Sequence, residues 1–164
     1  MYNIGFLPNN IIGEIMIKDI MSKKIIFSSI NSSIKDISKL MKENNVGFIP
    51  IKQNNKYIGV ITDRDICLSL SIIKDLNDSI KSYITLNIVS IDINANINEA
   101  LNLMSKYKVK RLLVKNKEDI IGVLSLSDIL NYTNSDNIIN TYKSIFYTHD
   151  NNTNISTQVD DFYL

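Results

Sequence analysis

Apolar residues follow two periodicities along this chain, and the same succession of periodicities occurs twice. Spacings of three and four residues, as in Ile34, Ile37 and Met41, predict a helix with one apolar face. Short apolar runs bounded by polar turns, as in residues 57–61, predict strands. Met41 aligns with Met104 at an offset of 104 − 41 = 63 positions, and much of the chain superposes at the same offset. An internal repeat of this kind predicts two similar units that bury a core together.

Each unit has the order β-α-β-β-α. The expected strands are residues 25–27, 47–51 and 57–61 in the first unit and residues 88–89, 111–114 and 120–124 in the second. The expected helices begin at polar residues that suit an N-cap, namely Ser32 or Ser33, Thr62, Asn96 and Ser125. The predicted fold class is therefore α/β, with two pseudo-symmetric repeats packed through their sheets.

We place the first repeat at residues 14–74, the second at 75–132 and a C-terminal extension at 133–164. The extension carries an apolar stripe at helical spacing, made of Ile138, Ile139, Tyr142, Ile145 and Phe146. Residues 136–147 are therefore a candidate helix, which either packs on its own repeat or contacts a second copy of the chain. The polar residues 150–160 are expected to be disordered.

A glycine, a hydroxyl and a carboxylate recur at the same phase of both repeats. They are Gly59, Thr62 and Asp65 in the first repeat and Gly122, Ser125 and Asp128 in the second. A glycine within a strand lets another group approach the backbone closely. A hydroxyl at a helix start suits a phosphate, and a carboxylate one turn later suits the two hydroxyls of a ribose. The same spacing is also a capping box, which closes a helix without any ligand, and the two interpretations can hold together.

Composition excludes several classes of function. The 164 residues have a net charge of +1, which gives no field to attract nucleic acid or a membrane surface. No segment has the length of a membrane span and residues 1–18 do not form a signal peptide, so we expect a cytoplasmic location. With Cys67 and His149 as the single residues of their types, we predict no catalytic site, no metal site and no enzymatic activity. Because apolar residues flank it, Cys67 is expected to be buried.

The repeat, the order of elements and both motifs together resemble a tandem pair of CBS (cystathionine-β-synthase) domains, also called a Bateman module. The resemblance spans residues 14–131, and the segments that carry it are residues 18–22, 46–51, 59–66, 109–114 and 122–130. It implies a regulatory protein that binds AMP, ADP, ATP or S-adenosylmethionine in two clefts between the repeats and needs no other cofactor. It also implies a homodimer that acts on a partner protein, whose identity the sequence does not give.

The resemblance assigns residues to each cleft. In one cleft Asp128 would hold the ribose and Ser125 the phosphate, Lys110 and Arg111 would add positive charge, and the base would rest near Ser22 and Ile26. In the other cleft the corresponding residues are Asp65, Thr62, Arg64, Thr85 and Val89.

The two clefts are not expected to be equal. The repeat offset aligns Lys110 and Arg111 with Gly47 and Phe48, which bring no charge. We therefore expect the Asp128 cleft to prefer phosphorylated adenosine, and the Asp65 cleft to be weaker, empty or suited to a less anionic adenosyl ligand. The alternative function is a ligand-free interaction or dimerisation module, in which the motifs serve only as helix caps.

Overall fold

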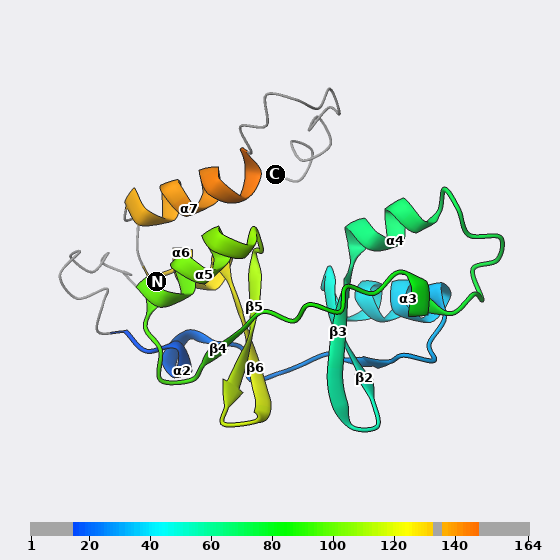
Figure 1. The fold of residues 1–164 in the computed structure, drawn as a ribbon, viewed down its shortest axis with the longest axis horizontal. Coiled ribbons are helices and arrows are strands. Elements are labelled where there is room, and N and C mark those ends of the chain that lie inside the picture. The colour runs from blue at the N-terminus through cyan, green and yellow to red at the C-terminus, as the bar shows by residue number, and fades with distance from the viewer. Residues whose placement is uncertain (1–14, 133–135, 148–164) are drawn as a thin grey trace.

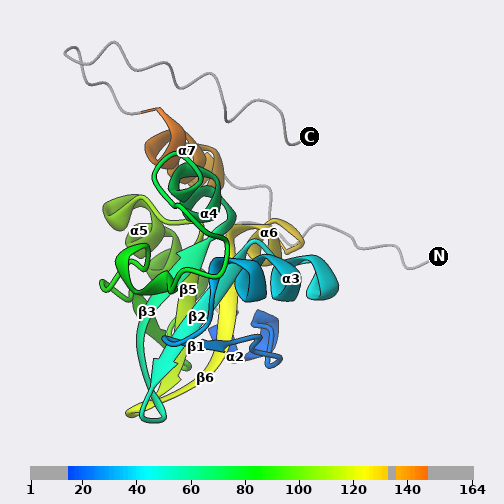
Figure 2. The ribbon, with the colours of Figure 1, turned by 90° about the vertical axis from the view of Figure 1, so that its right-hand side faces the viewer.

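The computed structural model describes residues 15–132 and 136–147, which form two halves lying side by side (Figure 1). Within these residues, each half has a three-stranded sheet that faces the other half, with its longer helices on the outer side (Figures 1 and 2). The first half contains β1 (Ser28–Ser29), α3 (Ile34–Asn44), β2 (Phe48–Gln53), β3 (Lys56–Thr62) and α4 (Asp63–Ser69). The second contains β4 (Ser90–Asp92), α5 (Ile97–Tyr107), β5 (Arg111–Asn116), β6 (Asp119–Ser125) and α6 (Leu126–Leu130). This succession confirms the predicted α/β repeat.

The strand that opens each sheet begins later than the apolar pattern predicts. The pattern predicts strands at residues 25–27 and 88–89, whereas β1 begins at Ser28 and β4 at Ser90, each parallel to the next strand. The prediction is wrong because the earlier apolar residues lie in segments that cross between the halves. Of these residues, Ile26 packs against the core of the first half and Val89 against that of the second, while the strands themselves begin only where the crossing ends.

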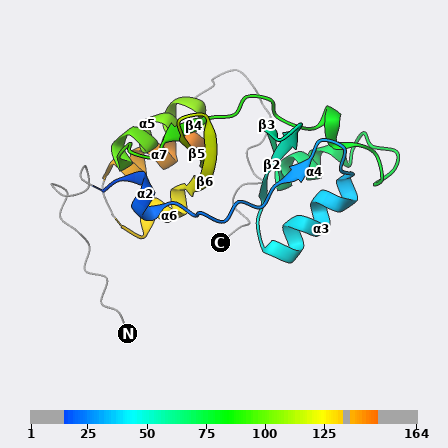
Figure 3. The same cartoon turned by 90° about the horizontal axis from the view of Figure 1, so that it is seen from below.

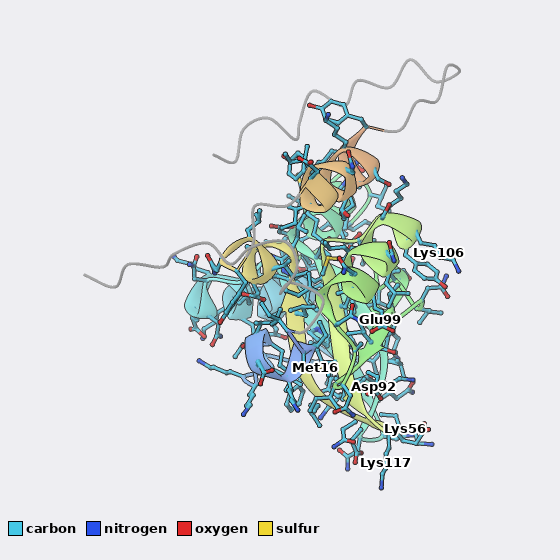
Figure 4. The ribbon with its side chains drawn as sticks, turned by 90° about the vertical axis from the view of Figure 1, so that its left-hand side faces the viewer. Met16, Lys56, Asp92, Glu99, Lys106 and Lys117 are labelled. Atoms are coloured by element: carbon cyan, nitrogen blue, oxygen red, sulfur yellow. The ribbon has the colours of Figure 1, made fainter. Side chains whose placement is uncertain are left out.

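The two antiparallel hairpins match the prediction more closely. β2 and β3 are joined at Asn54 and Asn55, whose φ angles of 49° and 63° lie in the left-handed region that asparagine tolerates. The ladder of each hairpin has an irregularity at the same repeat position, after Ile51 in the first half and after Val114 in the second. Both hairpin turns point to the same end of the molecule, as Lys56 and Lys117 show in Figure 4.

Each half completes its core with a short helix from the other repeat of the sequence. In the second half, α2 (Ile17–Ile20) buries Ile17 and Ile20 in the core that contains Leu112 and Leu124. The Ile17 N–H donates to the Ala95 carbonyl at 2.8 Å, which fixes α2 on this half. Figure 1 shows α2 beside the sheet that contains β6.

The reverse exchange occurs in the first half. There the 3-10 helix η1 (Ile80–Ser82) buries Ile80 in the core that contains Ile37 and Ile61. The Ile80 N–H donates to the Ser32 carbonyl at 3.1 Å. The boundary between residues 74 and 75 therefore remains a prediction about sequence units, because the packing crosses it in both directions.

Capping boxes begin the helices α3, α4, α5 and α6. In each box the N-cap side chain accepts the N–H of the third helical residue, whose own side chain accepts the N-cap N–H. The pairs are Ser33 with Asp36, Thr62 with Asp65, Asn96 with Glu99, and Ser125 with Asp128. The hydrogen bond from the Ser33 N–H, followed by that from its hydroxyl, lowers the pKa of Asp36 below its ordinary value of 3.8. The predicted helix starts are thus confirmed.

The C-terminal extension contains the predicted helix, α7 (Asp136–Phe146), which packs on α5 (Figure 1). Ile138 is 4% exposed and Thr141 is also buried, so one side of α7 faces the second half. On the other side, Ile139 is 50% exposed and Tyr142 is exposed as well. The apolar stripe is therefore buried on one side of α7 and exposed on the other. A contact between its exposed residues and a second copy of the chain remains a prediction. The expected disorder at residues 150–160 lies outside the described residues.

Cys67 does not lie in a core as the sequence suggests, since its side chain is exposed on α4. The prediction is wrong because α4 packs on the core of the first half through Ile66, which leaves Cys67 and Leu68 on its outward side. Leu68, beside it, is 60% exposed.

Candidate functional site

Two segments that cross between the halves lie beside the strands that carry the glycines. Ser22 and Val123 in β6 exchange two backbone hydrogen bonds, each N–H donating to the other carbonyl at 2.9 Å. Thr85 and Val60 in β3 exchange the same pair of bonds at 2.8 and 2.9 Å. Figure 3 shows the two crossing segments on opposite sides of the molecule. Each motif strand therefore lies next to a segment that leads to the other half.

The glycines of the motif strands make room for these crossing segments. A Cβ added at Gly59 would lie 2.6 Å from the Thr85 carbonyl oxygen. A Cβ added at Gly122 would lie 2.8 Å from the Ser22 carbonyl oxygen and 2.8 Å from the Met21 sulfur. The sequence predicts a close approach to both glycines, and the approaching group is the chain's own backbone.

The two motif carboxylates hold the starts of α6 and α4. Asp128 Oδ2 accepts from the Ser125 N–H at 2.8 Å and from its hydroxyl at 2.6 Å. Asp65 Oδ2 accepts from the Thr62 N–H and hydroxyl, both at 2.8 Å. The capping interpretation is therefore realised in both repeats. Because a carboxylate has a second oxygen, Oδ1 can accept a hydrogen bond from a ligand while Oδ2 keeps the cap.

The four residues expected near the base divide between the two halves. Ser22 and Thr85 are exposed beside the motif strands of the second and first half respectively. Ile26 packs against the core of the first half, and Val89 packs against the core of the second. The structure thus brings Ser22 to the Ser125 side and Thr85 to the Thr62 side, while Ile26 and Val89 lie at the far end of each crossing.

The cations expected to favour the Asp128 cleft lie beside its motif. The Lys110 carbonyl accepts the N–H of Leu126, the first residue of α6, at 2.9 Å. Arg111 pairs with Ser125 in the ladder between β5 and β6. Their backbones therefore border the Ser125 cap, and a contact between either side chain and a phosphate stays a prediction.

The side chains of these cations have aromatic partners that the sequence interpretation missed. The Lys110 ammonium lies 3.9 Å from the ring centroid of Phe146 in α7. The Arg111 guanidinium lies 5.9 Å from the ring centroid of Phe48 in β2. For Arg111 a signal existed, because the repeat offset aligns it with Phe48 and equivalent residues of a pseudo-symmetric pair can meet. For Lys110 none existed, since nothing in the sequence fixes the position of α7.

Arg64, the cation expected in the Asp65 cleft, lies in the first turn of α4. Its N–H donates to Asp63 Oδ1 at 2.8 Å, and its side chain is exposed. A contact between its guanidinium and a phosphate stays a prediction.

The described residues contain neither a cluster of metal ligands nor a membrane-spanning helix. Within residues 15–132 and 136–147, no three His, Cys, Asp or Glu side chains gather closely enough to hold a metal ion. Over the same part of the chain, no helix combines the length and apolar character needed to cross a membrane. A hollow of about 240 Å³ between α5 and α7 is lined by Asn98, Leu101, Asn102, Ser105, Asn140 and Thr141. None of these six residues belongs to the predicted clefts.

Comparison with known proteins decides which family this architecture represents. The family profile of the CBS domain matches residues 17–71 and again residues 80–135. The chain belongs to the CBS domain family. The two matches include both copies of the motif, so the two halves are a tandem CBS domain pair.

Two similar proteins come from Bacillus subtilis and Methanocaldococcus jannaschii. The CBS domain-containing protein YhcV of Bacillus subtilis is 29% identical over 114 residues, which cover 69% of this chain and 81% of YhcV. The uncharacterized protein MJ0450 of Methanocaldococcus jannaschii is 33% identical over 139 residues, covering 82% of this chain and 73% of that protein.

Among solved structures, the CBS domain pair of protein MJ0100 is similar in fold, with a TM-score of 0.64 and 26% identity. The similarity covers 71% of this chain and 93% of that one. The MJ0100 pair was crystallised in complex with 5′-methylthioadenosine and S-adenosyl-L-methionine.

Proposed function

We propose that this CBS domain pair is a regulatory sensor that binds an adenosine-containing ligand between its two halves and acts through a partner protein. The observation that carries the proposal is the pairing of Ser22 with Val123, which sets a segment of one repeat beside the Ser125 and Asp128 motif of the other. A ligand bound there would touch segments of both repeats, and one that reached Ile26 would also touch the first half and respond to the relative position of the halves. The adenosine ligands of the MJ0100 pair support this choice of ligand class.

Asp128 has two functions in this proposal. Its Oδ2 stabilises the start of α6, and its Oδ1 accepts the hydroxyls of a ribose. Asp65 has the same arrangement in the first half. The proposal therefore predicts two separable effects of each carboxylate, one on stability without ligand and one on ligand binding.

The cleft at Asp128 is the main nucleotide site of the proposal. Lys110 and Arg111 border the Ser125 cap there, and the corresponding residues at the other cleft are Gly47 and Phe48. Two cations attract a phosphate by charge-assisted hydrogen bonds, which are about twice as strong as neutral ones. We assign phosphorylated adenosine to this cleft, and a less anionic adenosyl ligand to the cleft at Asp65.

A thermal unfolding panel tests the proposal. Wild-type protein and Asp128→Ala are unfolded with AMP, ATP, adenosine, 5′-methylthioadenosine and S-adenosylmethionine. A ligand at about one hundred times its Kd adds roughly 2.7 kcal/mol to the free energy of unfolding. Asp36→Ala is the matched control, because Asp36 occupies the same position of a capping box in α3 and lies outside the cleft.

The expected result separates the cap from the site. Both Asp128→Ala and Asp36→Ala lower stability without ligand, because each removes the carboxylate half of a capping box. Only Asp128→Ala loses the increment from a phosphorylated ligand. If no adenosine compound stabilises the wild-type protein, the alternative of a ligand-free interaction module replaces the proposal.

The proposal includes association with a second copy, which exposed apolar residues on the helices support. Leu68 on α4, Leu130 on α6 and Tyr142 on α7 are exposed. Light scattering of wild type and Leu68→Glu tests this part by itself: a dimer that becomes a monomer in the variant supports it, and a wild-type monomer contradicts it.

A further inference from the structure

The last turn of α7 contacts both lysines of the loop that joins α5 to β5. The Lys108 ammonium donates to the Ser144 carbonyl and, at 2.6 Å, to the Ser144 hydroxyl. The Lys110 ammonium lies 3.9 Å from the ring centroid of Phe146, whose other neighbour is the stacked ring of Tyr142 at 4.2 Å. A cation near the C-terminal carbonyls of a helix and a cation over an aromatic face are both favourable contacts. The basic loop therefore helps to hold α7 on the second half.

The same loop borders the Ser125 and Asp128 motif. The Lys110 carbonyl accepts the N–H of Leu126, which follows the N-cap Ser125 directly. The position of Lys110 thus lets one side chain serve either of two partners, the ring of Phe146 or an anion at the motif.

The first repeat has no lysines at the positions that correspond to Lys108 and Lys110. At the equivalent loop, the repeat offset of 63 aligns Lys108 with Asn45 (108 − 63 = 45) and Lys110 with Gly47 (110 − 63 = 47). Asn45 and Lys108 share the left-handed conformation, with φ of 51° and 55°, so the loop geometry is kept while the charge is not. The two lysines and their contacts with α7 are therefore features of the second half alone.

We propose that α7 is a latch on the Asp128 cleft: its Phe146 ring and the phosphate of a bound nucleotide compete for Lys110. This inference rests on the proposed function and adds a regulatory element to it. A phosphorylated ligand draws Lys110 from Phe146 and weakens the hold on α7, while an unphosphorylated adenosine ligand does not. By thermodynamic linkage, a protein whose α7 is loosened must in turn bind the phosphorylated ligand more tightly.

The test is a comparison of AMP and adenosine binding by isothermal titration. Phe146→Leu removes the aromatic face under Lys110 and keeps an apolar side chain at the end of α7. The matched control is Tyr147→Leu, because Tyr147 directly follows the last residue of α7 and is 67% exposed. Lys110→Gln removes the shared cation, and Lys106→Gln, which lies at the outer side of α5 (Figure 4), controls for the loss of one positive charge.

The latch predicts that Phe146→Leu binds AMP about two- to fivefold more tightly, the factor expected for loss of an exposed cation–π contact. Adenosine binding should not change, nor should AMP binding by Tyr147→Leu or Lys106→Gln. In a Lys110→Gln background, Phe146→Leu should have no further effect on AMP.

Three results would overturn the inference. Equal AMP affinity in wild type and Phe146→Leu overturns the latch and leaves the proposed function intact. An equal gain for AMP and adenosine shows that α7 does not act through the phosphate, with the same consequence. Binding of neither compound to any variant overturns the latch and the nucleotide site together.

Hydrogen exchange of the α7 amides gives a second readout. With saturating AMP, α7 should exchange faster than in the protein without ligand, and adenosine should leave it unchanged. Unaltered or slower exchange with AMP contradicts the competition for Lys110.

Discussion

Arg111 and Phe48 occupy the same position in the two repeats, and they contact each other. The guanidinium of Arg111 lies 5.9 Å from the ring centroid of Phe48, although 111 − 48 = 63 residues separate them in the chain. Both residues begin the middle strand of their sheets, and each pairs with the hydroxyl residue of its motif, Ser125 or Thr62. Equivalent residues can touch only near the pseudo-two-fold axis, so this contact joins the two halves between the two predicted clefts.

A double-mutant cycle on Arg111→Ala and Phe48→Ala should show that the two side chains stabilise each other. Chemical denaturation of the single and double variants should give a coupling energy of about 0.5–1 kcal/mol, as for a cation over an aromatic ring near the surface. Strictly additive losses would contradict a direct contact between the halves at this point.

The glycines of the motif strands are required by the crossing segments. Gly59→Ala and Gly122→Ala should each lower the free energy of unfolding by about 1–3 kcal/mol, because the new methyl group meets a backbone carbonyl. Gly47→Ala is the control: its Cβ would meet only the end of the exposed Asp63 side chain, which can rotate away. Equal losses at all three glycines in a urea titration would contradict this account.

The packing of α7 can be measured with two neighbouring isoleucines. Ile138 is 4% exposed and Ile139 is 50% exposed. Truncation of a buried isoleucine to alanine usually costs 2–5 kcal/mol, whereas surface changes stay within about 0.5 kcal/mol. Thermal unfolding of Ile138→Ala and Ile139→Ala should therefore differ widely at low protein concentration. If Ile139→Ala is the more damaging change, α7 packs through its other side.

The capping box of α3 should make stability fall in acid. The pKa of Asp36 is lowered from 3.8 in the folded protein because its carboxylate accepts hydrogen bonds from Ser33. The ionised Asp36 therefore contributes its full stabilisation at pH values above its pKa in the unfolded chain. This stabilisation is lost as the pH falls through its lower pKa in the folded protein. Stability curves of wild type and Asp36→Ala should differ at neutral pH and converge in acid. A difference that does not depend on pH would contradict the role of the ionised cap.

The sequence predicts local features of this protein well, because they depend on residues close together in the chain. Ser33, Asn96 and the two motif hydroxyls cap the helices they were expected to start, and asparagines at 54 and 55 form the expected turn. The internal repeat also predicts which elements correspond.

The exchanged helices could not be predicted in the same way. The apolar side chain of Ile17 would fit the core of either half. Only the path of the chain decides that it packs with Leu112 and Leu124. The partners of the cations depend on the same long-range packing. Nothing near Lys110 in sequence indicates that Phe146, on a helix outside the repeats, will cover its ammonium. Local patterns thus predict the helix caps and the hairpin turn, while the partners of the candidate site residues require the fold.

The most direct test of the nucleotide site is a residue-resolved titration. In a two-dimensional amide NMR spectrum, AMP should shift the signals of Ser22, Val123, Ser125 and Asp128, and should leave those of Lys56 and Lys117 at the hairpin turns unchanged. The same titration of Asp128→Ala should give no such shifts. Absence of shifts in the wild-type protein, or shifts confined to residues outside the motif and its crossing segment, would contradict the account.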